Sequence, residues 1–152
     1  MEAIAKARLF VAGLDRRLGD RLRAVVLFGS QARGEARPDS DVDLLILLRD
    51  APPYFERCFL AGDVAREVDA DFSSRLSPLL YDEREARDTR PIFYDIAVDG
   101  IVLLDRAGAW AQIRERVLAR IRELGSQRVT DSAGNRFWIL APSAPFGTPV
   151  EL

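Results

Sequence analysis

Histidine is missing from this sequence of 152 residues, and cysteine occurs once, at Cys58. The absence of histidine excludes Ser-His-Asp hydrolysis, Cys-His nucleophiles, and zinc or haem sites with histidine ligands. A single cysteine cannot form a disulfide within the chain, so nothing in the sequence points to an oxidising compartment. Any acid–base or metal chemistry must therefore use carboxylates, lysine, tyrosine or the one thiol.

Long apolar segments are also missing. The longest strongly apolar run, Leu44 to Leu48, is far shorter than the roughly 20 residues that span a bilayer. The first ten residues, MEAIAKARLF, contain no apolar block of the kind found in signal peptides. We therefore expect a cytoplasmic protein with no membrane segment.

The sequence has little net charge. Lys and Arg total 22, Asp and Glu total 24, and the net charge is −2. This balance gives no strong signal for binding nucleic acid through a globally basic surface. A hydrophobic content of 48% with 30% charged residues is typical of a folded globular protein. The length suits one domain with a sizeable core, so we expect residues 1–152 to form a single domain.

Hydrophobic periodicity predicts alternating helices and strands. Apolar residues at steps of three and four predict the helices, and short apolar or alternating runs predict the strands. The expected helices are 2–18, 54–66, 78–88, 91–98 and 109–124, and the expected strands are 23–28, 41–48, 68–76 and 101–104. Two short β-like runs, 127–130 and 137–140, predict a hairpin within a C-terminal segment, 125–152. The fold class is therefore α/β or α+β, with a small sheet flanked by helices and a C-terminal β-hairpin.

The segment Gly29 to Leu44, GSQARGEARPDSDVDL, carries the chemical signal. Glycine allows a phosphate to approach the backbone closely, and Ser30 can donate both its hydroxyl and its N–H. Arg33 could meet a phosphate with its guanidinium group. The alternatives are that Gly29-Ser30 is only a turn, and that Arg33 forms a surface salt bridge with Glu35 or Asp39.

Asp41 and Asp43 occupy alternate positions at the start of the strand 41–48, so both side chains should point to one face. Two carboxylates this close repel each other unless one is protonated or a cation lies between them. Mg²⁺ commonly bridges carboxylates to substrate phosphates. A phosphate-binding turn beside paired carboxylates indicates phosphoryl or nucleotidyl transfer, whereas an isolated Asp-x-Asp is usually a solvated strand end.

The motif Gly29-Ser30, Ala32-Arg33-Gly34 and Ser40-Asp41-Val42-Asp43-Leu44 resembles that of the polymerase-β-type nucleotidyltransferase superfamily, in particular the minimal nucleotidyltransferases (MNT proteins). The resemblance implies a nucleotidyltransferase core with a small mixed sheet. It also implies two Mg²⁺ ions bound by Asp41, Asp43 and a third acidic residue on a neighbouring strand.

The third carboxylate should lie in the strand expected near 68–76, where Asp69 and Asp71 would share a face. We prefer Asp71 as the third catalytic and metal-binding residue, because its distance from Gly100 suits the family layout, and keep Asp69 as the alternative. The resemblance assigns nucleotide binding to Gly29 and Ser30; we add Arg33 and Ser40 as further nucleotide-binding candidates.

By the same resemblance the substrate is ATP, and the chain is an adenylyltransferase with a HEPN-domain protein as its partner. It would act as the antitoxin of a toxin–antitoxin pair by transferring AMP to that partner. One alternative is a binding module that neutralises a HEPN partner sterically, without catalysis. Another is a small-molecule nucleotidyltransferase that works as a homodimer, with its acceptor site between subunits.

Overall fold

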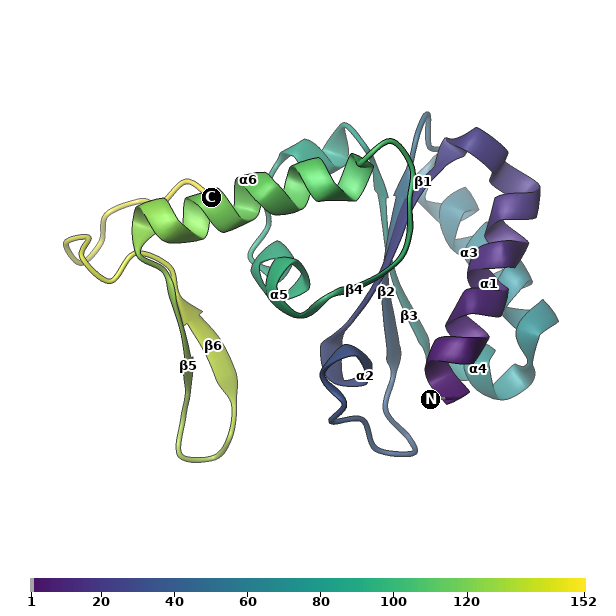
Figure 1. Ribbon diagram of the computed structural model, residues 1–152, viewed down its shortest axis with the longest axis horizontal. Helices are drawn as coiled ribbons and strands as arrows, with labels where there is room; N and C mark the ends of the chain where they lie inside the picture. Colours follow the sequence, from purple (N-terminus) through teal and green to yellow (C-terminus); the bar gives the residue numbers. More distant parts are fainter. Residues whose placement is uncertain (1) are drawn as a thin grey trace.

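A computed structural model describes residues 2–152 and contains a four-stranded mixed sheet with helices on both faces (Figure 1). The strands of this sheet are β1 (Leu22–Phe28), β2 (Val42–Leu48), β3 (Leu76–Asp82) and β4 (Ile101–Asp105). The helices are α1 (Glu2–Leu18), α2 (Gly29–Arg33), α3 (Tyr54–Val68), α4 (Ala70–Arg75), α5 (Ile92–Asp99) and α6 (Ala109–Leu124), with short 3-10 helices at Gly19–Arg21 and Glu85–Arg87. The expected fold class, a small mixed sheet flanked by helices, is confirmed.

The sheet order is β3-β2-β1-β4. Strand β1 pairs antiparallel with β2 and β4, and β2 pairs parallel with β3. Strands β1 and β2 are buried on both faces, as their continuous apolar sequences predict. Because side chains alternate along a strand, each central strand contributes to two separate cores.

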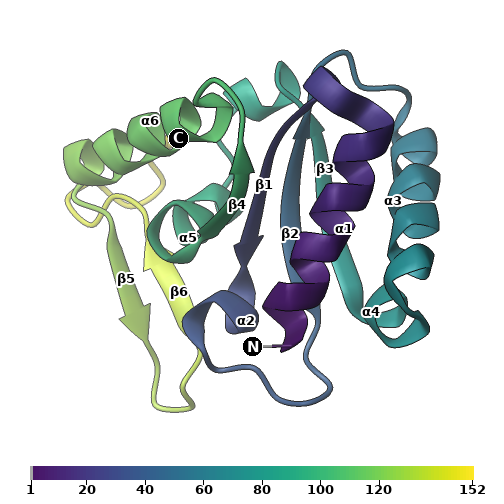
Figure 2. The ribbon, with the colours of Figure 1, turned by 45° about the vertical axis from the view of Figure 1, so that its right-hand side comes forward.

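The α1–α3 core lies on one face of the sheet, under α1, α3 and α4, and includes Phe10, Leu44, Ile46 and Phe72. The α5–α6 core lies on the other face. It includes Val26, Leu45, Leu47, Tyr94 and Trp110. Figure 2 shows α1 and α3 on one side of the sheet and α5 and α6 on the other.

The expected strand over 68–76 is wrong. Helix α3 continues to Val68, and α4 follows at once, with Asp69 as its N-cap accepting a 2.7 Å hydrogen bond from the backbone N–H of Phe72. An aspartate at this position satisfies a free N–H of the first helical turn, which favours a helix start over an extended strand. The alternation of apolar Val68, Ala70 and Phe72 with polar residues indicated a strand with one buried face. In the structure only Phe72 of these three residues is buried.

The third strand instead occupies Leu76–Asp82, where a helix over 78–88 was expected. Pro78 cannot donate to a sheet ladder, but β3 is an edge strand, and a proline is tolerated there. The parallel alignment with β2 places Asp43 opposite Ser77 and Leu45 opposite Leu79. The expected helices 2–18 and 109–124 agree with α1 and α6, and α5 lies within one residue of the helix expected over 91–98.

The expected C-terminal hairpin is present as a separate two-stranded sheet, β5 (Gln127–Thr130) and β6 (Arg136–Ile139). It packs beside α5 and reaches towards α2 (Figure 2). The Arg128 guanidinium contacts Asp99 at 2.5 Å, and the Trp138 indole N–H donates to Asp95 at 3.0 Å. No helix in residues 2–152 is long and apolar enough to cross a membrane.

Candidate active site

Gly29 and Ser30 lie where β1 ends and α2 begins. Gly29 has a φ of +71°, a left-handed conformation that favours glycine. A Cβ atom at this position would collide with Oδ2 of Asp43. The glycine therefore makes the turn possible and leaves room for the carboxylate beside it.

Asp43 lies on the α5–α6 side of the sheet, because it alternates with Leu45 and Leu47, which belong to that core. Asp41 is exposed, two positions before it, and Asp43 is half-buried. Burial raises the pKa of the Asp43 carboxyl, and the negative charge of Asp41 raises it further, whereas a hydrogen bond from Ser77 and the charge of Arg33 lower it. The ionised pair is therefore unfavourable by itself, which is the electrostatic condition that a bound cation relieves.

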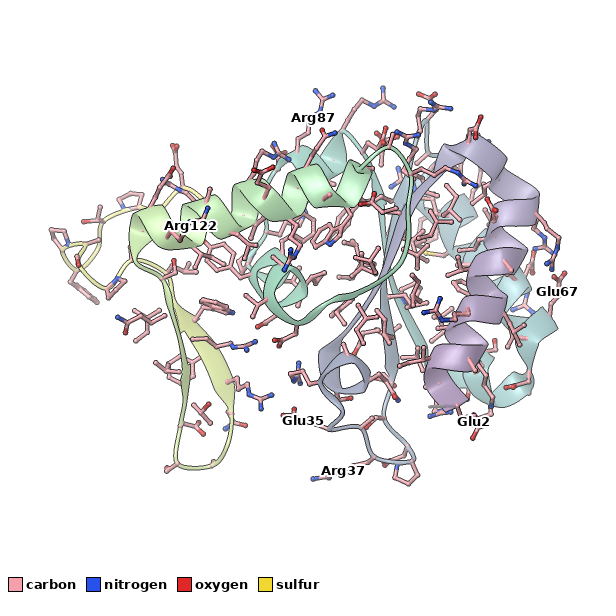
Figure 3. The ribbon with its side chains drawn as sticks, viewed as in Figure 1. Glu2, Glu35, Arg37, Glu67, Arg87 and Arg122 are labelled. Carbon is pink, nitrogen blue, oxygen red and sulfur yellow. The ribbon has the colours of Figure 1, made fainter. Side chains whose placement is uncertain are left out.

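An open cleft of about 470 Å³ gathers the residues that the sequence motif singled out. It is lined by Gly29, Ser30, Arg33, Arg37, Asp39, Ser40, Asp41 and Asp43. Figure 3 shows Arg37 on the loop between α2 and β2, and Glu35 on the same loop near the hairpin. All of the predicted nucleotide-binding residues and two of the predicted carboxylates thus share one cleft.

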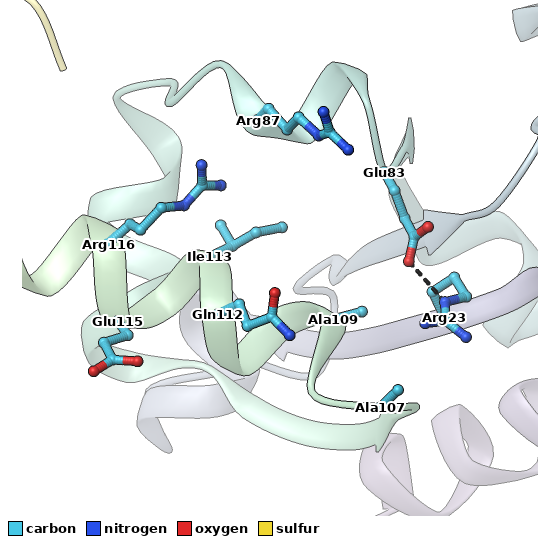
Figure 4. A pocket seen from close by; sticks show the side chains of 9 residues that line it. All are labelled: Arg23, Glu83, Arg87, Ala107, Ala109, Gln112, Ile113, Glu115 and Arg116. Atoms are coloured by element: carbon cyan, nitrogen blue, oxygen red, sulfur yellow. Dashed lines mark hydrogen bonds and ion pairs between the residues drawn. The ribbon is translucent and has the colours of Figure 1, made fainter.

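A larger cleft, of about 700 Å³, lies elsewhere (Figure 4). It is lined by Arg23 at the start of β1 and by residues of α6, such as Arg116, whereas Asp43 lies opposite Phe28 at the end of β1. The two clefts are therefore at opposite ends of the sheet. None of the predicted site residues lines the larger one.

Ser40 shapes the loop that leads into β2. Its hydroxyl accepts a 2.8 Å hydrogen bond from the backbone N–H of Arg37, and its own N–H donates to the Arg37 carbonyl at 3.0 Å. Arg75 holds the same loop from α4, donating to the carbonyls of Pro38 and Ser40 at 3.1 and 3.4 Å. In this structure Ser40 therefore positions the loop, and its assignment to nucleotide binding stays a prediction.

Arg33 forms the salt bridge that was the alternative to phosphate binding. Its Nε lies 2.9 Å from Oε2 of Glu35, and Nη1 lies 3.9 Å from Oδ2 of Asp99. Glu35 also accepts two hydrogen bonds from Arg136 on the hairpin, at 2.8 and 2.5 Å. Arg136 and Arg33 together lower the pKa of Glu35 to about 2. Glu35 and Arg136 are 101 positions apart, so no local sequence pattern could have revealed this bridge.

The structure does not bring Asp69 or Asp71 to the carboxylate pair, contrary to the expectation of a third carboxylate there. Asp71 lies 2.6 Å from Arg75 and 3.3 Å from Lys6, and Asp69 lies 3.0 Å from Lys6. Both aspartates belong to the α4 region, whose Phe72 packs in the α1–α3 core on the other face of the sheet. Within residues 2–152 no group of three or more His, Cys, Asp or Glu residues is arranged to hold a metal ion.

Asp41 and Asp43 are the predicted carboxylates that this cleft offers to a divalent cation. Asp41 and Asp43 supply carboxylate oxygens, which suit Mg²⁺, and the missing side chain at Gly29 leaves room for Oδ2 of Asp43. The residue next to Asp43 on the neighbouring strand is Ser77, which was not predicted as a site residue because the third strand was expected over 68–76. The apolar Leu76, Leu79 and Leu80 were the signal that could have located this strand.

Comparison with known proteins agrees with this geometry. Residues 9–100 match the nucleotidyltransferase domain family. The chain is 29% identical over 118 residues to a Methanocaldococcus jannaschii protein named "Putative protein adenylyltransferase MJ1305", covering 76% of this chain and 80% of that protein.

Two solved structures share the fold. The first is described as a toxin–antitoxin with AMP-PNP (TM-score 0.55, 21% identity, 77% of this chain and 88% of that one). The second is described as a tri-AMPylated Shewanella oneidensis HEPN toxin in complex with an MNT antitoxin (TM-score 0.52, 19% identity, 82% and 89%). The matched residues 9–100 include both the glycine turn and the carboxylate pair. This chain therefore belongs to the nucleotidyltransferase domain family.

Proposed function

We propose that this chain is an adenylyltransferase that transfers AMP from ATP to a hydroxyl group of a HEPN-type partner protein, acting as its antitoxin. The observation that carries the proposal is the juxtaposition of Gly29 and Ser30 with Asp41 and Asp43 in one cleft. Each pair alone has an ordinary structural explanation, whereas together they provide a phosphate-binding turn and a cation-binding pair.

Different residues of the cleft would bind different parts of a nucleoside triphosphate. Gly29 and Ser30 bring the backbone at the start of α2 to the cleft, and Ser30 offers its hydroxyl and N–H as donors to a phosphate. Arg33 and Arg37 line the same cleft and can balance phosphate charge, Arg33 by exchanging Glu35 for a phosphate oxygen. Asp41 and Asp43 would hold a divalent cation, which, when bound, neutralises charge on the triphosphate and favours the departure of pyrophosphate.

The transfer itself is a substitution at phosphorus. The acceptor hydroxyl oxygen forms a bond to the α-phosphorus, the bond from that phosphorus to the pyrophosphate oxygen breaks, and the hydroxyl proton passes to water. The protein contributes mainly by positioning the groups in line and by electrostatics.

The choice of partner is supported by the proteins that share the fold. One of them is an MNT antitoxin in complex with a HEPN toxin that carries AMP groups, and another was solved with an ATP analogue. The M. jannaschii relative bears the name of a protein adenylyltransferase. These observations support a protein acceptor for the present chain.

The test is transfer of label from radioactive ATP to a purified HEPN-type partner in the presence of Mg²⁺. We expect the wild type to label the partner, and the variant Asp41→Asn with Asp43→Asn to lose at least about 100-fold in rate, since both cation ligands are removed. Asp63→Asn is the control, because it makes the same chemical change on an exposed part of α3. An unlabelled partner with the wild type would defeat the transferase, even if the two proteins bind each other.

A second function, steric neutralisation of the partner without catalysis, is favoured by one observation. The strand beside Asp43 carries Ser77 where a third carboxylate would complete a larger metal site. Cells that produce the toxic partner distinguish the two functions. If the double Asp→Asn variant restores growth as well as the wild type, catalysis is dispensable.

A further inference from the structure

Ser77 occupies the position beside Asp43 on the same face of the sheet. Strands β2 and β3 are parallel and in register, with Asp43 opposite Ser77. Asp43 alternates with Leu45 and Leu47, and Ser77 alternates with Leu79 and Tyr81, all four of which pack in the α5–α6 core. Hydrogen bonding by the Ser77 hydroxyl is one of the causes that lower the pKa of Asp43, which agrees with the adjacent positions of the two side chains. The immediate neighbour of the carboxylate pair is therefore a neutral hydroxyl.

The charges around the cleft suit one divalent ion and not two. Asp41 and Asp43 together offer carboxylate oxygens for a single divalent cation. Two ions a few ångströms apart require further shared anionic ligands. Asp39 also lines the cleft, but within residues 2–152 no group of three acidic side chains is arranged to hold a metal ion. Arg33 and Arg37 line the same cleft, and their positive charges oppose a second cation.

We propose that this site binds one divalent cation per chain together with the nucleotide, and that Ser77 is a positioning residue that holds the Asp43 carboxylate for that ion. The proposal rests on the nucleotide binding that the proposed function includes, but not on the identity of the acceptor. Residue 77 then decides how many ions the site holds. An aspartate there would supply the missing anionic ligand.

The ion count can be measured without any transfer reaction. Mn²⁺ shares the oxygen ligands of Mg²⁺, and its binding can be followed by electron paramagnetic resonance. We would titrate Mn²⁺ into the whole chain with a saturating non-hydrolysable ATP analogue, and subtract a titration of the analogue alone. We expect one bound ion per wild-type chain and two per Ser77→Asp chain.

The positioning role has its own variants. Ser77→Ala removes the hydroxyl, and we expect it to keep one ion but to weaken Mn²⁺ binding about 10-fold, as loss of a group that orients a ligand typically does. Ser77→Thr retains a hydroxyl on a residue that suits a strand, and should bind Mn²⁺ as the wild type does. Equal melting temperatures of the three proteins without Mn²⁺ would separate this effect from folding.

The outcomes distinguish this inference from the proposed function. Two ions per wild-type chain, a single ion in Ser77→Asp, or unchanged Mn²⁺ affinity in Ser77→Ala would overturn the inference and leave nucleotidyl transfer standing. If Ser77→Asp does not fold, the wild-type count and the Ala and Thr variants still decide. A wild-type chain that binds neither the ion nor the analogue would instead contradict the proposed function.

Discussion

Gly29 and Asp43 are the residue pair on which the geometry of the site depends. The glycine has a left-handed backbone, and its missing side chain is what leaves room for an oxygen of Asp43. A left-handed conformation costs an L-residue roughly 1–2 kcal/mol. A substitution at Gly29 adds a direct collision with the carboxylate to this cost.

Gly34 offers a matched control, since it has the same φ of +71° but no atom within 4 Å of the place that a Cβ would occupy. We expect Gly34→Ala to lower the free energy of unfolding by roughly 1–2 kcal/mol and to retain ATP binding. Gly29→Ala should destabilise the chain more and weaken ATP binding at least 10-fold, because Asp43 must move. Thermal unfolding and nucleotide titration of both variants measure this. Equal behaviour of the two variants would mean that the collision has no functional consequence.

At the scale of elements, the hairpin β5–β6 is held beside the site by ion pairs and one aromatic contact. Arg136 bridges to Glu35, Arg128 bridges to Asp99, and Trp138 packs edge-on against Tyr94 with ring centroids 5.2 Å apart. Since Glu35 also pairs with Arg33, this one carboxylate connects the hairpin to the nucleotide cleft.

The hairpin contact should depend on pH through Glu35. Its pKa is lowered from 4.5 to about 2, so the ionised form stabilises the folded chain. This contribution is complete above pH about 4.5 and is lost as the pH falls towards 2. We expect Glu35→Gln to increase hydrogen exchange of residues 127–139 several-fold at neutral pH, and to remove the wild-type loss of protection on acidification. Glu67→Gln, which removes the Arg17 partner far from the hairpin, is the control. Unchanged exchange in Glu35→Gln would show that the other contacts are sufficient.

At the scale of the whole molecule, ligand binding to the native state should appear as added stability. A ligand at 100 times its dissociation constant stabilises the native state by about 2.7 kcal/mol. In a chain of this length each kcal/mol raises the melting temperature by about 2–4 °C. We therefore expect Mg²⁺ with ATP to raise the wild-type melting temperature by several degrees.

The variant with Asp41→Asn and Asp43→Asn should show a much smaller rise. Differential scanning calorimetry with and without Mg²⁺ and ATP measures both proteins. An equal rise would place the nucleotide outside the cleft at the carboxylate pair. The larger cleft lined by Arg87 and Arg116 would then be the place to examine (Figure 4).

Local pattern was sufficient for most elements of this fold. The apolar runs of β1 and β2, the helical spacing of α1 and α6, and the turn between β5 and β6 are properties of neighbouring residues, and each element was found where it was expected. The motif from Gly29 to Leu44 likewise placed the glycine turn beside the carboxylate pair. These features could be predicted because periodicity and turn chemistry act over only a few residues.

The region 68–82 was not predictable in the same way. Asp69 and Asp71 alternate with apolar residues, a pattern typical of a strand. Burial of Phe72 under α1 and capping by Asp69 favour a helix instead. The strand that pairs with β2 starts only at Leu76. Propensity alone could not decide between these states, because the pairing partner is distant in sequence.

The amino-acid order was enough to predict a sheet buried on both faces and an acidic pair beside a glycine turn. Both features follow from residues that are close together in the chain. Which residues share a face with that pair depends instead on how the chain packs. The register of β2 and β3 brings Ser77 to Asp43, and the packing of Phe72 places Asp69 and Asp71 on the opposite face. A shift of one residue in a strand reverses the face of every side chain, and that register is set by contacts between distant segments.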